Sequence, residues 1–186
     1  FLIGTMNTAD RSITTLDTAL RRRFQFQEIQ PDASVLAGIN VEGISISNML
    51  IRMNKRICIL YDREHTIGHS YFMPLKEACR QTTNSPDSDP IATVSSARSK
   101  TPFELLGEIF ANNILPLLQE YFYEDYEKIR LVLGDNQKEN RADQFIVEIR
   151  EDSGALFGTT AYDFDETSLY EINPEAFGRI DAYRYI

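Results

Sequence analysis

Residues 103–133 read FELLGEIFANNILPLLQEYFYEDYEKIRLVL, and this stretch decides the fold class. Its large apolar residues recur at steps of three and four, the spacing of one face of an α-helix. We expect a helix over 103–126 that is kinked or restarted at Pro116, because proline lacks the N–H that an unbroken helix needs. Helix should continue over 126–133 and end in a turn at Gly134-Asp135-Asn136. The apolar stripe consists of Phe103, Leu106, Ile109, Phe110, Ile114, Leu117, Leu118, Tyr121 and Phe122.

Two further helices are expected upstream of this stretch. Residues 44–61 carry apolar residues at the same spacing, and residues 71–81 are also expected to be helical. The polar connector 62–70 between them holds both histidines, His65 and His69. Residues 82–100 are rich in serine and poor in large apolar residues, so we expect an exposed, mobile loop. The buried face of the 44–61 helix should consist of Ile46, Met49, Leu50, Met53, Ile57 and Leu60.

The two ends of the chain differ from this helical centre. At the start, 1–5 reads as a buried strand, about 13–22 as a helix and 24–29 as an alternating strand that Pro31 ends. At the other end, 145–149 reads as a strand, and 156–162 is a candidate for a second one, with turns at Ser153-Gly154 and Asn173-Pro174. The expected fold is therefore mainly α with a small β-rich tail.

Composition excludes several classes of protein. The 186 residues are 42% hydrophobic and 25% charged, which is ordinary for a soluble globular chain. No apolar run approaches the roughly 18 residues of a membrane span, so we expect no membrane contact. The net charge of −9 should repel DNA, and the only dense basic cluster is Arg21-Arg22-Arg23. Cys58 and Cys79 form no metal or disulfide pattern, so we expect buried free thiols.

Three separated blocks resemble one family in order and spacing. IGTMNTADRSI (3–13) with LDTALRRRFQFQEIQP (16–31) is similar to the sensor-1 strand and arginine-finger helix of McrB-type AAA+ proteins. REHTIGHSYFM (63–73) and ILPLLQEYFYEDYEKIRLVLGD (114–135) resemble the helical lid of the same family. The resemblance covers about 1–135. It implies a remnant of the AAA+ α/β core over 1–31 and a lid over 32–142 with the loop 82–100. Residues 143–186, which the resemblance does not cover, are expected from their own pattern to form a small β-rich appendage.

The resemblance implies roles for residues near the start of the chain. Asn7 matches the sensor-1 residue, a neutral hydrogen-bonding group that orients the attacking water beside the γ-phosphate. From the residues alone, a turn asparagine is the simpler interpretation. Asp10 and Arg11 complete the family's pattern and should organise the nucleotide site or the subunit interface. A surface ion pair near a helix start is the alternative.

Arg22 and Arg23 match the positions of arginine fingers, which neutralise charge on a phosphoryl group from a neighbouring subunit. Basic residues in the last turn of a helix also favourably meet its dipole, and Arg21 is assigned to that role. His69 lies where the lid approaches the nucleotide, so it is a candidate for packing against the base, beside the alternative of a structural turn. A metal site at His65 and His69 is not expected, because no cysteine or third histidine supports one.

The phosphate-binding motif of the family is absent from these residues. No GxxxxGK[ST] pattern occurs, and the acidic Walker B lookalike at 57–62 lies inside a helix-periodic stretch. The chain also opens without Met, so we expect a C-terminal fragment that is inactive alone. The full-length parent would be an NTPase that uses Mg²⁺ with GTP or ATP.

The resemblance also implies partners and a compartment. The parent would form a hexameric ring in the cytoplasm, work with a nuclease subunit of the McrC type, and contact DNA through another region. A non-catalytic interaction module that keeps the lid shape is the alternative. Its tyrosine-rich acidic tail would then contact a partner protein through Tyr162, Tyr170, Tyr183 and Tyr185. A third possibility is an AAA+ chaperone of another clade.

Overall fold

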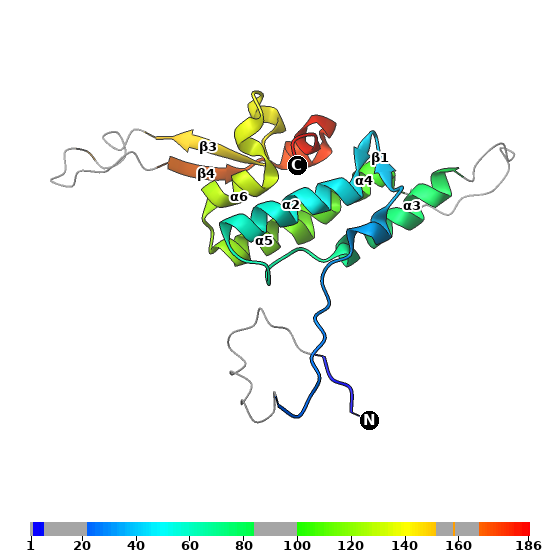
Figure 1. Ribbon diagram of the computed structural model, residues 1–186. Helices are drawn as coiled ribbons and strands as arrows, with labels where there is room; N and C mark the ends of the chain where they lie inside the picture. Colours follow the sequence, from blue (N-terminus) through cyan, green and yellow to red (C-terminus); the bar gives the residue numbers. More distant parts are fainter. Residues whose placement is uncertain (1, 6–21, 84–99, 152–157, 159–167) are drawn as a thin grey trace, which may run out of the picture.

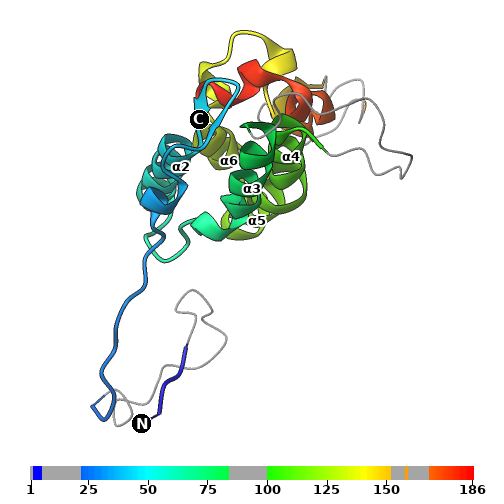
Figure 2. The ribbon, with the colours of Figure 1, turned by 90° about the vertical axis from the view of Figure 1, so that its right-hand side faces the viewer.

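The computed structural model describes residues 2–5, 22–83, 100–151, 158 and 168–186. Their helices pack into one body, from which the segment before residue 32 extends on one side and the β3–β4 ribbon on another (Figures 1 and 2). The α-helices are α2 (Ile46–Leu60), α3 (Met73–Thr83), α4 (Pro102–Ile109), α5 (Leu115–Phe122) and α6 (Tyr126–Leu133). The strands are β1 (Asn40–Val41), β2 (Ile44–Ser45), β3 (Ile146–Arg150) and β4 (Ser168–Ile172).

Short 3-10 helices connect these elements: η1 (Ala33–Leu36), η2 (His69–Phe72), η4 (Asp135–Gln137), η5 (Arg141–Asp143), η6 (Pro174–Gly178) and η7 (Ile180–Tyr183). The mainly helical fold with a small β part is as the sequence predicts. No helix within the described ranges is long and apolar enough to cross a membrane.

The first predicted helix is α2, and its buried face is the predicted one. Ile46, Met49, Leu50, Met53 and Ile57 are buried, and Leu60, also predicted, is half-buried. Ser45 caps the helix by accepting the N–H of Asn48 at 3.4 Å. A short β1–β2 hairpin that the sequence analysis did not predict comes before it. Its two turn residues, Glu42 and Gly43, both have positive φ, as a tight type I′ hairpin turn requires.

The helix predicted over 103–126 forms only as far as Phe122, with a defect in front of Pro116. The predicted continuation into 126–133 is wrong at 123–125, because Tyr123 and Glu124 have positive φ and Asp125 caps a new helix, α6. Thr101 and Glu104 form a capping box at the start of α4. A π-turn, η3 (Phe110–Ile114), then joins α4 to α5, and Pro116 lies in the first turn of α5. Pro116 has no N–H to donate, and the first turn of a helix does not need that donor. The wider π-turn before it accommodates the hydrogen bond that is missing there. Gly134 ends α6 in the left-handed conformation, as predicted.

The tail packs into the same core as the helices. β3 confirms the predicted strand at 145–149, and it pairs antiparallel with β4. The other predicted strand, 156–162, lies outside the described residues except for Gly158. The ring of Phe145 stacks on Phe110 at 5.6 Å between centroids and meets Tyr183 edge-on at 5.1 Å. These rings pack the tail against the π-turn. The predicted domain boundary at 143 therefore does not coincide with a gap in the packing.

Three predictions about local structure are wrong. Residues 24–29 and 2–5 form no strand and are exposed, because no described strand lies beside them to share backbone hydrogen bonds. Cys58 is exposed on the outer face of α2 and Cys79 is half-buried, so neither is a buried thiol. The predicted helix at 13–22, apart from Arg22, and most of the predicted loop 82–100 lie outside the described residues.

Candidate functional site

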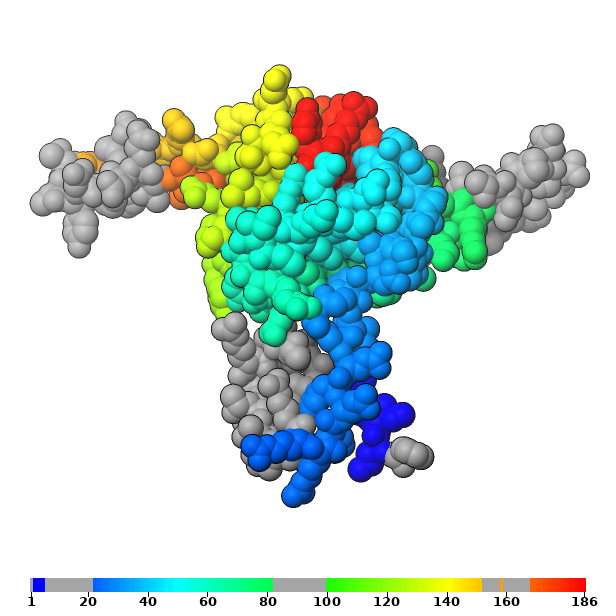
Figure 3. Space-filling model, viewed as in Figure 1, coloured from blue at the N-terminus to red at the C-terminus, as the bar shows by residue number. Residues whose placement is uncertain are grey.

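The structure describes three of the six predicted site residues. Asn7, Asp10 and Arg11 lie outside the described residues. Arg22 and Arg23 lie exposed in a turn, on the segment that projects away from the helical body in Figure 3. His69 lies within the body, at the start of η2. Among the described residues, the two arginines therefore do not lie with His69, and the site that can be built is the one around His69.

His69 ties the connector to the segment that enters the body. Its Nδ1 accepts the backbone N–H of Asp32 at 3.1 Å. A neutral imidazole has one donor and one acceptor nitrogen, so Nε2 of His69 carries the proton and can donate. Asp32 caps η1 by accepting the N–H of Ser34 at 2.9 Å. Hydrogen bonding from the Ser34 side chain and, to a smaller extent, from its backbone N–H lowers the pKa of the Asp32 carboxyl.

The first half of the connector is anchored by the other histidine. Nδ1 of His65 lies 2.7 Å from the Asp62 carboxylate, which also accepts the backbone N–H groups of Glu64 and His65. Burial acts to raise the pKa of Asp62, but these bonds outweigh it and the pKa is lowered. The imidazole is buried and packs edge-on against Tyr61 of the α2 C-cap and Tyr121 of α5. His65 is thus a structural anchor between two helices.

The second half of the connector is held by α2 itself. The side chain of Asn54 accepts the N–H of Ile67 at 2.7 Å and donates to its carbonyl at 2.9 Å. Ile67 is fully buried, so this amide satisfies backbone groups that cannot reach water. Gly68 and His69 follow directly. Their position is therefore set by α2 as well as by η2.

A second contact joins the incoming segment to the connector. Arg63 donates from Nη2 to both carboxylate oxygens of Glu28 at 3.0 Å. Both side chains are well exposed, so this pair contributes little stability by itself.

A mostly apolar groove of about 530 Å³ runs beneath the segment. It is lined by Gln30, Pro31, Ala33, Ile51, Asn54, Lys55, Cys58, Ile59 and Thr66. Within the described residues, no group of three or more His, Cys, Asp or Glu side chains is placed to hold a metal ion.

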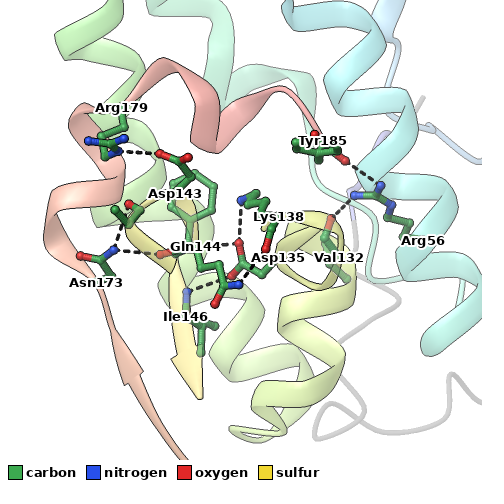
Figure 4. Close-up of polar contacts among 12 residues, drawn as sticks. Arg56, Val132, Asp135, Lys138, Asp143, Gln144, Ile146, Asn173, Arg179 and Tyr185 are labelled. Carbon is green, nitrogen blue, oxygen red and sulfur yellow. Dashed lines mark hydrogen bonds and ion pairs between the residues drawn. The ribbon is translucent and has the colours of Figure 1, made fainter. Parts of the chain in front are cut away.

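A separate buried polar cluster joins the tail to the helices (Figure 4). Asp135 accepts the N–H groups of Phe145 and Ile146 and pairs with Lys138 at 2.6 Å. Burial raises the pKa of Asp135 and lowers that of Lys138, and each group's charge partly offsets the shift of the other. Arg56 of α2 donates to the carbonyls of Val132 and Tyr185 at 2.8 and 2.7 Å. This cluster fixes the chain after α6.

Sequence reasoning missed the contacts that build the site. Glu28, Asp32 and Arg63 carry no pattern that pairs them across 35 or more residues of chain. Asn54 did carry a signal, because it is a polar residue next to the buried stripe of a helix.

Comparison with known proteins identifies the helical part of this structure. Residues 45–130 match the family described as McrB, alpha-helical lid domain. These bounds run from the N-cap of α2 into α6 and include the whole connector. The chain is also 32% identical over 153 residues to the type IV methyl-directed restriction enzyme EcoKMcrB subunit of Escherichia coli (strain K12). That match covers 73% of this chain and 29% of the relative, so the chain spans less than a third of the relative's length. Both comparisons show that this chain contains an α-helical lid domain of the McrB type, over residues 45–130.

Proposed function

We propose that this chain forms the lid side of a nucleotide site in an AAA+ NTPase that acts in methyl-directed DNA restriction. The observation that carries the proposal is the double tie of the segment 28–32 to the connector, through Glu28 to Arg63 and Asp32 to His69. In the proposed assembly this segment is the hinge between the α/β core, with its remnant at 1–31, and the lid. Both ties hold the hinge at a defined place on the lid.

The proposed nucleotide lies between core and lid, with its base near His69. Asn7 acts within the subunit by orienting the attacking water, and Asp10 and Arg11 organise the site. Arg22 or Arg23 reaches the nucleotide of the neighbouring subunit in a ring, proposed to be a hexamer. The exposure of both arginines is compatible with action in trans, since a finger must leave its own subunit surface.

The protonated Nε2 of His69 bears on the choice of base. Guanine presents two acceptors, O6 and N7, where adenine presents an amino donor and N7. A donor at His69 therefore suits guanine better, and we propose GTP as the preferred substrate. The phosphates and Mg²⁺ are assigned to residues outside this sequence, because the 186 residues contain no P-loop pattern. The chain's own residues supply the hinge, the base contact and the arginines.

The wider proposal follows the relative's description as a restriction enzyme subunit. The full-length protein would work in the cytoplasm with a nuclease subunit of the McrC type. It would contact DNA through another region, since this chain carries a net charge of −9. Of the tyrosines named for the alternative interaction tail, Tyr183 is 1% exposed and Tyr170 stacks on Tyr126, whereas Tyr185 is exposed and Tyr162 lies outside the described residues.

The decisive experiment measures hydrolysis of GTP and ATP by the full-length protein, with Arg22→Ala/Arg23→Ala as the test variant. Loss of an arginine finger should lower stimulated turnover by about 10³- to 10⁵-fold while nucleotide binding persists. Arg52→Ala, an exposed arginine on α2, is the matched control and should retain turnover. Full turnover in the double variant would refute the finger, and absence of turnover in the unmodified protein with partner and DNA would refute the NTPase.

A further inference from the structure

Asn54 is an unusual residue for its position. It lies in the middle of α2, between the buried Met53 and the groove, and is half-buried itself. Asparagine is disfavoured in helix interiors because its side chain competes for backbone hydrogen bonds. Here the amide bonds to Ile67, 13 residues further along the chain, and not to its own helix. The cost of placing it in α2 is therefore offset by a contact that fixes the connector.

The geometry of this contact is that of a strand partner. One amide accepts the N–H and donates to the C=O of the same residue, so both backbone groups of Ile67 are tied to α2. His69, two residues on, then accepts the N–H of Asp32. Asn54 also lines the groove together with Gln30 and Pro31 of the hinge. A continuous series of bonded groups thus runs from α2 through the connector to the hinge.

We propose that Asn54 is a positioning residue, which holds His69 and the hinge in the orientation that binds nucleotide. The inference rests on the proposed function. It gives α2 a role in the site that does not depend on direct contact with nucleotide. His65 anchors the other half of the connector through Asp62, so it cannot replace the restraint on Ile67.

Asn54→Ala is expected to lower the fraction of molecules that are in the conformation that binds GTP. When a binding-competent state falls to one tenth of the population, the apparent Kd rises tenfold, while the bound complex is unchanged. Asn54→Ala should accordingly raise the KM for GTP roughly tenfold and leave kcat within about twofold. A residue that acted only on overall stability would lower the amount of active protein and leave KM unaltered.

The test uses the full-length protein with GTP, comparing Asn54→Ala, His69→Ala and the double variant by GTP binding and hydrolysis. Because Asn54 acts through His69, the double variant should bind GTP within about twofold of His69→Ala alone. Asn48→Ala, an exposed asparagine on the same helix, is the control and should match the unmodified protein. Asn54→Asp keeps the side-chain size and the acceptor for Ile67 but loses the donor, and it serves if the alanine variant does not fold.

The outcomes separate the two proposals. A raised KM in Asn54→Ala that disappears in the His69→Ala background supports the positioning role. Normal KM in both Asn54 variants, or effects of Asn54→Ala and His69→Ala that multiply, would overturn it while leaving the NTPase intact. If the unmodified protein neither binds nor hydrolyses GTP, the proposed function fails first.

Discussion

Removing the charge of Asp135 should destabilise the chain more than any other single polar substitution in its core. The carboxylate is fully buried and accepts three hydrogen bonds, at 2.6 Å from Lys138, 3.0 Å from Phe145 and 2.9 Å from Ile146. Asp135→Asn leaves the buried Lys138 ammonium without its paired carboxylate and with only the weaker attraction of Asp143. It also turns an amide N–H₂ toward one of the two backbone donors, so that donor loses its acceptor.

The magnitude follows from these losses. Removal of one partner of a buried ion pair costs about 3–5 kcal/mol, because the remaining charge stays out of water. The Lys138 ammonium also lies 4.2 Å from the centroid of the Phe145 ring, which gives it some compensation and places the expected loss near the lower value. Since small domains are stable by about 5–15 kcal/mol, Asp135→Asn should remove a large fraction of the total.

The assay is urea unfolding of the chain followed by circular dichroism, with the double variant Asp135→Asn/Lys138→Met as the second arm. Methionine keeps the apolar stem of lysine and removes its charge, so the double variant should recover about 1–3 kcal/mol relative to the single one. A loss below about 1 kcal/mol in Asp135→Asn would refute the reasoning. A double variant less stable than the single one would show that the pair is not coupled by charge.

Three further predictions follow from local geometry. Gly134→Ala should cost more than Gly38→Ala by about 1–3 kcal/mol in urea unfolding; both have positive φ, but only the new Cβ at 134 would lie 2.6 Å from a backbone oxygen. Thr101→Ala should cost about 1 kcal/mol in the same assay, because it removes the capping box of α4. The pKa values of Asp62 and Asp125 are lowered by folding, so their stabilisation is present above the ordinary aspartate pKa of about 4 and is lost as pH falls below it. The midpoint temperature of thermal unfolding should fall between pH 7 and pH 3, and it should fall less in Asp125→Asn.

The helical part was predictable because its signals are local. The stripe of α2 reads directly as a buried face, and Gly134 ends α6 where a left-handed residue is needed. Pro116 correctly marked a break, although the sequence does not reveal that the break is a π-turn placed before the proline. Such periodic and capping patterns depend on residues three or four positions apart, which a single sequence displays.

The failures arise where the deciding partner is distant in the chain. Residues 24–29 alternate between apolar and polar side chains as a strand does. Such a pattern indicates that one face needs burial, but it does not show that a neighbouring segment is there to bury it. Cys58 lies in an apolar-rich stretch, yet it falls on the outer face of α2. The ties of Glu28 to Arg63 and of Asp32 to His69 join residues 35 and 37 positions apart, so composition gives no sign of them. The family resemblance pointed to His69, while its bonded partner came only from the structure.

α2 joins the hinge contacts to the tail. Asn54 bonds to the connector, while Arg56, two positions on, bonds to the carbonyls of Val132 in α6 and of Tyr185 in the tail. Two residues of an α-helix are about 200° apart around its axis, so these side chains leave α2 on nearly opposite sides. A close-packed helix moves as a rigid element, and a shift of the hinge is therefore expected to be passed to the tail without unfolding of either. The tail's aromatic packing on the π-turn should resist that shift, because the rings of Phe145 and Tyr183 contact Phe110.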